Sequence, residues 1–120
     1  MEVLGIRYCA VTAEAAALIK CFAALGMPKT DYAEEGVSGS VFPAGSSWIE
    51  IWQGAPDSPA NTMLQVVVDD ADAFAAHARK NGLSPEGPTD AHGERIYFLK
   101  APGGLQMSFQ SKLAESPVLC

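Results

Sequence analysis

A glutamate between two tryptophans has the clearest chemical potential in this sequence. Trp48, Glu50 and Trp52 alternate with Ile49 and Ile51. In a strand, alternate side chains project from the same face, so the carboxylate shares one face with both indoles and the isoleucines share the other. A carboxylate in such surroundings serves either as a ligand-recognition group or as a general base.

Arg7 gives Glu50 a third interpretation. It lies in an apolar stretch, residues 3–11, whose composition predicts a first strand in the same half of the chain. An arginine and a glutamate on strands of one half are natural ion-pair partners, and the pair would favour the ionised carboxylate. Recognition, ion pairing and general-base chemistry all remain open for Glu50 at this point.

Other polar side chains recur at strand spacing towards the C-terminus. Ile96, Phe98 and, at the end of the strand, Lys100 share one face of a predicted strand. Gln106, Ser108 and Gln110 share one face of the next. One strand thus offers an apolar wall and the other an amide-rich wall. This mixture suits an organic ligand with several polar groups.

The segment ahead of these strands, residues 85–93, contains too much Pro and Gly for a regular strand. It predicts a mobile loop around a short strand. His92 lies in this loop and is either a ligand contact or a solvated surface residue. Cys9 shares the strand parity of Arg7 and is either a small packing residue or a nucleophile.

The elements that must position these residues occur twice along the chain. An apolar strand, an alanine-rich helix and three short strands account for residues 3–53, and the same order returns over residues 62–112. The glycines that end the two helices, Gly26 and Gly82, lie 56 residues apart. A fixed offset of this kind indicates a duplicated supersecondary unit. Residues 54–61 between the copies predict a linker.

Apolar spacing predicts which side of each helix is buried. Leu18, Phe22 and Leu25 recur on one face of the first helix. At the start of the second helix, Asp69 or Asp70 supplies an N-cap oxygen.

Composition narrows the classes of function. The 120 residues are 48% hydrophobic and 18% charged, which is typical of one globular domain. The net charge of −6 and the scattered basic residues argue against a nucleic-acid partner. No apolar run approaches the roughly 20 residues of a membrane span. The N-terminus also lacks the basic-then-apolar pattern of a signal peptide, so we expect a cytoplasmic protein. Three widely spaced cysteines support neither a disulfide framework nor a CxxC site.

Two short motifs, together with the duplication, resemble those of a known superfamily. Residues 98–104, Phe-Leu-Lys-Ala-Pro-Gly-Gly, are similar to an aromatic-x-x-Asp-Pro-Asp-Gly hairpin, and residues 21–26, Cys-Phe-Ala-Ala-Leu-Gly, are similar to a Phe-Tyr-x-x-Leu-Gly helix end. Both belong to the vicinal oxygen chelate superfamily of glyoxalase I, bleomycin-resistance proteins and extradiol dioxygenases. The resemblance implies a single α+β domain in which two βαβββ repeats form curved mixed sheets around a cup, with the helices on the outer face. It also implies a homodimer.

In that superfamily, the first and last strands of each repeat supply the metal ligands, usually His or Gln early and Glu late. The matching positions here are Arg7 (or Ile6 with a one-residue slip), Glu50, Met63 and Ser108. Arginine has no available lone pair, methionine sulfur is a soft donor, and neutral serine is a weak ligand. We therefore expect the metal site to be lost, with no cofactor in its place.

The resemblance and the residues together predict a protein that binds a small organic molecule in a metal-free cup. One alternative is a metal-dependent glyoxalase- or dioxygenase-like enzyme, and another is a non-catalytic interaction or regulatory domain whose cup is filled by its own side chains. The expected ligand-binding residues are Arg7, Trp48, Glu50, Trp52, Met63, His92, Phe98, Gln106 and Ser108.

Overall fold

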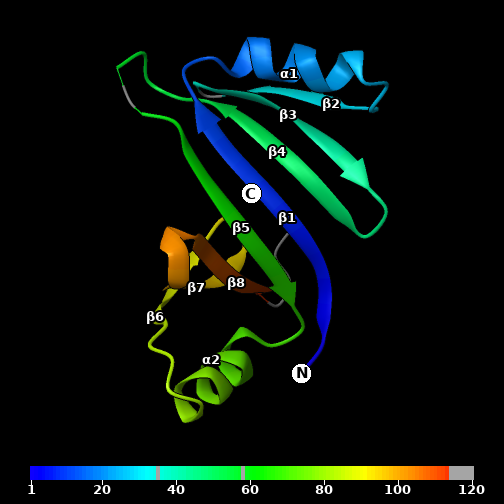
Figure 1. Cartoon of the computed structure of the whole chain (residues 1–120). Helices are drawn as coiled ribbons and strands as arrows, with labels where there is room; N and C mark the ends of the chain where they lie inside the picture. Colours follow the sequence, from blue (N-terminus) through cyan, green and yellow to red (C-terminus); the bar gives the residue numbers. More distant parts are fainter. Residues whose placement is uncertain (35, 58, 114–120) are drawn as a thin grey trace. The chain divides into compact units, whose positions relative to one another are not determined.

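The computed structural model describes residues 1–34, 36–57 and 59–113. The strand–helix–strand–strand–strand order occurs twice, as the sequence predicted (Figure 1). The elements are β1 (Val3–Thr12), α1 (Ala15–Ala24), β2 (Thr30–Glu34), β3 (Val37–Ala44), β4 (Ser47–Gln53), β5 (Asn61–Val68), α2 (Ala71–Lys80), β6 (Glu86–Ala91), β7 (Glu94–Lys100), the short 3-10 turn η1 (Pro102–Gly104) and β8 (Gln106–Lys112).

The chain divides into two compact units. We call Arg7–Thr62 the N-terminal unit, and the residues from Met63 onward, together with Met1–Ile6, the C-terminal unit. The first residues belong to the C-terminal unit because Glu2 and Asp69 are held together. The Glu2 backbone N–H donates to Asp69 Oδ1 at 2.9 Å, and the Asp69 N–H donates to the Glu2 carbonyl at 3.1 Å.

The N-terminal unit is a mixed sheet with α1 packed along one face (Figure 1). Its strands lie in the order β2–β3–β4–β1, with β1 and β4 parallel and the other neighbours antiparallel. The register places Arg7 opposite Trp48 and Cys9 opposite Glu50.

Ile51 lies on the face of β4 that meets the helix, as the alternation of the strand predicted. It is fully buried with Phe42 and Ala15, and the Phe22 ring meets the Phe42 ring edge-on at 5.6 Å. The prediction for Leu25 is wrong, because α1 ends at Ala24 and leaves Leu25 as a 71% exposed C-cap residue. The partly buried side chains packed on this core are those of Leu18, Ile19, Phe22, Met27 and Ile49.

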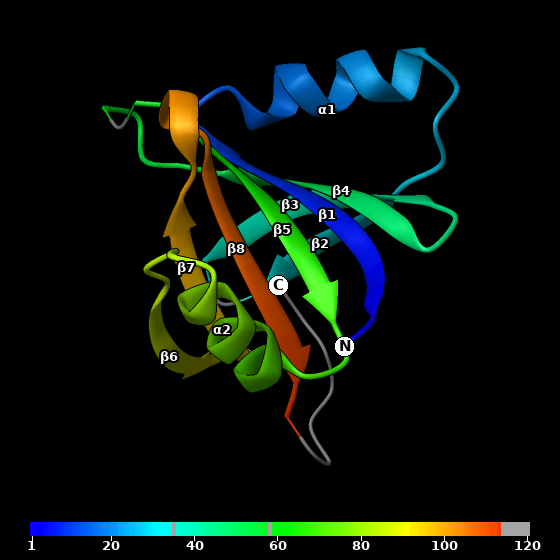
Figure 2. The same ribbon diagram turned by 60° about the horizontal axis from the view of Figure 1, so that its bottom comes forward.

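The C-terminal unit repeats this design around α2 (Figure 2). Its strands lie in the order β5–β8–β7–β6, with β5 and β8 parallel. The core under α2 consists of Val68, Ala71, Ala75, Tyr97 and Phe109. Neither helix of the described chain has an apolar stretch long enough to cross a bilayer.

Asp70 is the N-cap of α2, as predicted, and its Oδ1 accepts from the Ala73 N–H at 3.1 Å. The segment expected to be mostly loop instead forms β6 from Glu86 to Ala91. Two properties make this strand possible. It lies at the end of the strand order of its unit, where Pro88 is tolerated, and its register against β7 shifts between Glu86 and Thr89.

Candidate functional site

Glu50 is enclosed by donors from its own unit. Trp48 Nε1 donates to Glu50 Oε2 at 2.6 Å, and Trp52 Nε1 donates to Oε1 at 3.0 Å. Arg7 Nη1 lies 3.5 Å from Oε2, and its guanidinium stacks over the Trp48 ring at 5.1 Å. The predicted partnership of Arg7 and Glu50 is therefore present, reinforced by both indoles.

This group has little capacity for a ligand. Arg7 is fully buried and Glu50 is 2% exposed. Both carboxylate oxygens already accept N–H donors, so the geometry disfavours general-base chemistry at Glu50. The short donor distances are typical of charge-assisted hydrogen bonds, which fix the side chains that make them.

The absence of a side chain at Gly39 leaves room for the Trp52 indole. A Cβ built at Gly39 would overlap the Ile51 carbonyl oxygen and come within 2.5 Å of Trp52 Cε3. On the neighbouring strand, the Tyr32 ring lies 6.0 Å from the Trp52 ring. The indole therefore lies flat across β3 only because residue 39 has no side chain.

The matched strand of the C-terminal unit carries a chain of hydrogen bonds that ends on the carboxyl group of Glu94. Ser108 Oγ donates to Gln110 Oε1 at 2.7 Å, and Gln110 Nε2 donates to Glu94 Oε1 at 3.4 Å. All three side chains are buried. The Ser108 hydroxyl therefore donates to another side chain of the protein, although the sequence suggested that it would contact a ligand.

A pocket of about 390 Å³ lies within the C-terminal unit. It is partly open and combines five apolar side chains with four polar ones. Three of its residues, Met63, Phe98 and Gln106, were expected from the sequence to bind the ligand. The complete lining is Met63, Gly82, Leu83, Ser84, Glu86, Phe98, Leu99, Lys100, Gln106 and Met107.

Strand register brings the polar and aromatic lining residues onto one face of the sheet. Glu86 lies opposite Phe98, and Lys100 lies opposite Gln106. Residues directly opposite each other project from the same face, and Phe98 and Lys100 share a face because they alternate along β7. The pocket thus has a charged and aromatic side built from adjacent strands.

The wall that follows α2 is held in place by Arg79. Its Nη2 donates to the Pro85 carbonyl at 3.2 Å, and its guanidinium lies 5.6 Å from the Tyr97 ring. Leu83 and Ser84 lie between these anchor points in the sequence. The loop that lines the pocket is therefore tied to both the helix and β7.

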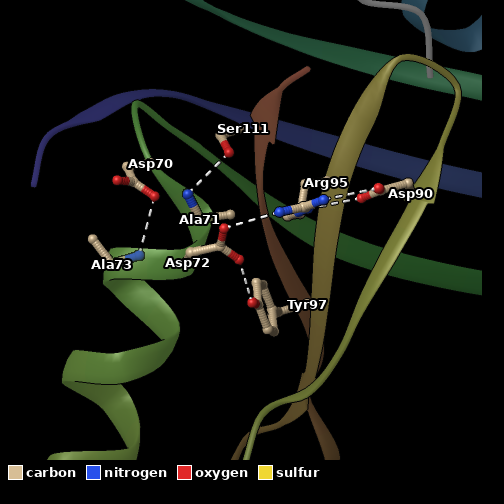
Figure 3. A network of polar contacts seen from close by, with 8 residues as sticks. All are labelled: Asp70, Ala71, Asp72, Ala73, Asp90, Arg95, Tyr97 and Ser111. Atoms are coloured by element: carbon tan, nitrogen blue, oxygen red, sulfur yellow. Dashed lines mark hydrogen bonds and ion pairs between the residues drawn. The ribbon is translucent and has the colours of Figure 1, made fainter. Parts of the chain in front are cut away.

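The other end of α2 is fixed by the network in Figure 3. Arg95 donates to Asp72 Oδ2 at 3.0 Å and, in a fork, to both oxygens of Asp90 at 2.9 and 3.0 Å. The Tyr97 hydroxyl also donates to Asp72. At the first residue of the helix, the Ala71 N–H donates to Ser111 Oγ at 2.9 Å.

Titration of this network follows from its contacts. The Tyr97 hydrogen bond, followed by the one from Arg95, lowers the pKa of Asp72, and the Arg95 hydrogen bond lowers the pKa of Asp90. The Asp72 carboxylate in turn raises the pKa of Tyr97. These shifts describe a clamp between helix and sheet, away from the residues that line the pocket.

The expected ligand-binding residues are thus divided among several places. Arg7, Trp48, Glu50 and Trp52 form the enclosed group of the N-terminal unit. His92 is exposed in the turn between β6 and β7, with a φ of 53°, and does not line the pocket.

Sequence reasoning missed two charged residues of the pocket. Lys100 carried a signal, since it alternates with Phe98 along β7. No sequence signal pointed to Glu86, because the segment that contains it was expected to be mostly loop.

No family model matches this chain, and no curated protein matches it either. Solved structures do match, at low identity and over nearly the whole chain. A hypothetical protein from Bacillus halodurans C-125 is 18% identical, with 97% of each chain covered and a TM-score of 0.63. A glyoxalase/bleomycin resistance protein/dioxygenase superfamily member from Vibrio splendidus 12B01 is 11% identical, covering 89% of this chain and 97% of its own, with a TM-score of 0.61.

A third structure is described differently, as an NAD-dependent benzaldehyde dehydrogenase from Legionella pneumophila. It is 10% identical, covers 89% of this chain and 98% of its own, and has a TM-score of 0.65. The three solved structures share the fold of this chain but have different descriptions. Their similarity therefore indicates the fold of this chain and does not indicate an activity.

Proposed function

Starting from the fold of the glyoxalase/bleomycin resistance/dioxygenase superfamily, we propose that this protein binds a small organic molecule in the pocket of its C-terminal unit. The observation that carries the proposal is the lining of that pocket. Apolar side chains such as Met63 and Phe98 combine there with a few polar groups, as in ligand sites generally. We place this activity in the cytoplasm.

The N-terminal unit has a structural role in this proposal. Its carboxylate is enclosed by Arg7 and both indoles and is nearly without solvent exposure. A ligand would have to break these contacts before reaching Glu50. Of the interpretations open for Glu50 from the sequence, the ion pair is the one that these distances favour.

A metal-dependent reaction fits the residues poorly. Of the four positions that match metal ligands in the superfamily, only Glu50 is a usual ligand, and its oxygens accept from nitrogen donors. Ser108 donates its hydroxyl to Gln110. Arginine and methionine at the other two positions do not suit Zn²⁺, Mn²⁺ or Fe²⁺. We therefore propose a metal-free binding site.

Methionine methyl groups offer a direct test. Two of the four methionines, Met63 and Met107, line the pocket, whereas Met1 and Met27 do not. In protein labelled with ¹³C at the methionine methyls, a screen of small aromatic compounds should shift the Met63 and Met107 signals and leave the other two unchanged. Equal shifts at all four, or shifts confined to Met1 and Met27, would overturn the proposal.

A pocket-filling variant gives the matched control. Ser84 lines the pocket and is exposed, so a Ser84→Trp side chain has room to occupy it. Compounds that shift Met63 and Met107 in the wild type should then lose at least tenfold in affinity. Undiminished binding would show that those compounds bind elsewhere.

We also propose a homodimer. Within the C-terminal unit, strand β1 exposes Leu4 and Ile6 by 49 and 37%, and these alternate residues give one face of the strand an apolar surface. Sedimentation at micromolar concentration should give about twice the 12.6 kDa of the chain. A single 12.6 kDa species would contradict the dimer.

A further inference from the structure

The pocket is lined by two oppositely charged side chains that form no ion pair with each other. Glu86 and Lys100 both line it, and both side chains are exposed. Glu86 lies opposite Phe98, so Lys100, two residues further along β7, is its diagonal neighbour. Diagonal neighbours in a sheet are about 7–8 Å apart, which long side chains can span. Nevertheless, within the described chain neither side chain forms a hydrogen bond or an ion pair.

From this arrangement we infer that the ligand is a zwitterion with an apolar body, such as an amino acid with a large apolar side chain. The inference rests on the proposed binding function and specifies its ligand class. Lys100 binds the carboxylate of the ligand, and Glu86 binds its ammonium group. Because the two charges flank the Phe98 ring on one sheet face, they can converge on groups attached to a single carbon atom.

The apolar lining accounts for the body of the ligand. Phe98 and Leu83 are 37% and 48% exposed and line the same pocket, so one bound apolar group can cover both side chains. Met63 and Met107 add unbranched, polarisable side chains that adapt to the shape of a bound group.

Overall charge favours a zwitterion over a simple anion. The protein carries 14 acidic and 8 basic residues, for a net charge of −6. A free carboxylate approaching Lys100 meets this field, whereas a molecule without net charge does not. A simple cation would be attracted to Glu86 but would leave Lys100 without a partner.

Three probes with one aromatic body separate these cases. L-Phenylalanine has both charged groups, 3-phenylpropanoate lacks the ammonium group, and 2-phenylethylamine lacks the carboxylate. Titration followed at the Met63 and Met107 methyls should give the tightest dissociation constant for L-phenylalanine. Each missing group should weaken binding roughly three- to tenfold, as expected for charged contacts at an exposed rim.

Variants assign each charge. Lys100→Gln should remove the advantage of L-phenylalanine over 2-phenylethylamine, and Glu86→Gln its advantage over 3-phenylpropanoate. Lys112→Gln and Glu14→Gln make the same charge changes outside the pocket and should leave both ratios unchanged. Equal binding of all three probes would overturn the zwitterion and leave the binding function standing. Absence of methyl shifts with every probe would overturn both.

Discussion

The two units solve the same structural problem with different side chains. Strands β4 and β8 end their respective repeats, and positions 58 residues apart pair Trp48 with Gln106 and Glu50 with Ser108. In the N-terminal unit these positions belong to a buried ion pair enclosed by indoles. In the C-terminal unit, Ser108 belongs to a chain of side-chain hydrogen bonds and Gln106 lines a pocket. A duplicated backbone can thus be closed in one copy and left open in the other by changes at matched positions.

The largest expected effect tests whether the N-terminal group is structural. Arg7→Met keeps an unbranched side chain of similar length but leaves Glu50 buried without its cation. Removing one partner of a buried ion pair costs about 3–5 kcal/mol. We expect a loss of this size in the free energy of unfolding, measured by urea denaturation followed by circular dichroism. Lys100→Met in the pocket should change it by less than about 0.5 kcal/mol, and equal losses would break the comparison.

The next effect compares the matched positions directly. Glu50→Gln places an amide N–H₂ against indole N–H groups and should cost about 2 kcal/mol, since hydrogen bonds to charged groups contribute about 1.5–3 kcal/mol. Ser108→Ala removes one donor to Gln110 and should cost about 1 kcal/mol. Both tryptophans donate to Glu50, so only the first variant should change their emission. The reverse order of stability losses would contradict this assignment.

A smaller effect distinguishes the units by acid titration. Asp72 and Asp90 have pKa values lowered from the usual 3.8, so their contribution to stability is present above about that pH and is lost as the pH falls through the lower values of the folded state. Arg95→Gln should lower the melting temperature at neutral pH, and the difference from wild type should shrink as the pH falls below about 4.

The N-terminal counterpart of this experiment is Asp31. Hydrogen bonds from Lys29, followed by one from Ser40, lower the pKa of Asp31. Lys29→Gln should show the same pH trend with a smaller amplitude. The reason is that Lys29 contacts a single carboxylate, whereas Arg95 contacts two and binds one of them in a fork. A melting-temperature difference that grows towards low pH in either variant would reverse the sign of the expected linkage.

The last prediction is that metal supplementation has no effect on the metal content of the protein. Among residues 1–34, 36–57 and 59–113, neither unit presents a donor set suited to a divalent metal, so the purified protein should carry no stoichiometric Zn, Ni, Mn or Fe. Elemental analysis after metal supplementation checks this directly. About one equivalent of metal that disappears in Glu50→Ala would show that the enclosed group opens to bind it.

Much of the scaffold was predictable because it depends on local chemistry. The alternation of Ile49 and Ile51 with the tryptophans determined the two faces of β4, and the Asp70 cap marked the start of α2. The partnership of Arg7 and Glu50 followed from charge and strand order alone.

The pocket was less predictable because it depends on register. The residue opposite Phe98 is Glu86, and that pairing passes through an irregular strand that contains Pro88. Composition predicted a loop there, since proline and glycine disfavour regular strands, but an edge position permits both. The surroundings of Ser108 depend on structure in a related way, because its hydroxyl donates to Gln110 on the same strand, a contact that composition does not indicate.

Gly39 restricts the order in which the enclosed group could have been assembled. Any Cβ at this position collides with the Trp52 indole and the Ile51 carbonyl. A tryptophan at position 52 is therefore compatible with this geometry only in a chain that already has glycine at position 39. A side chain at position 39 would force a shift of the Ile51 carbonyl and of the indole that donates to Glu50. The indole at position 52 and the absence of a side chain at position 39 are therefore mutually dependent.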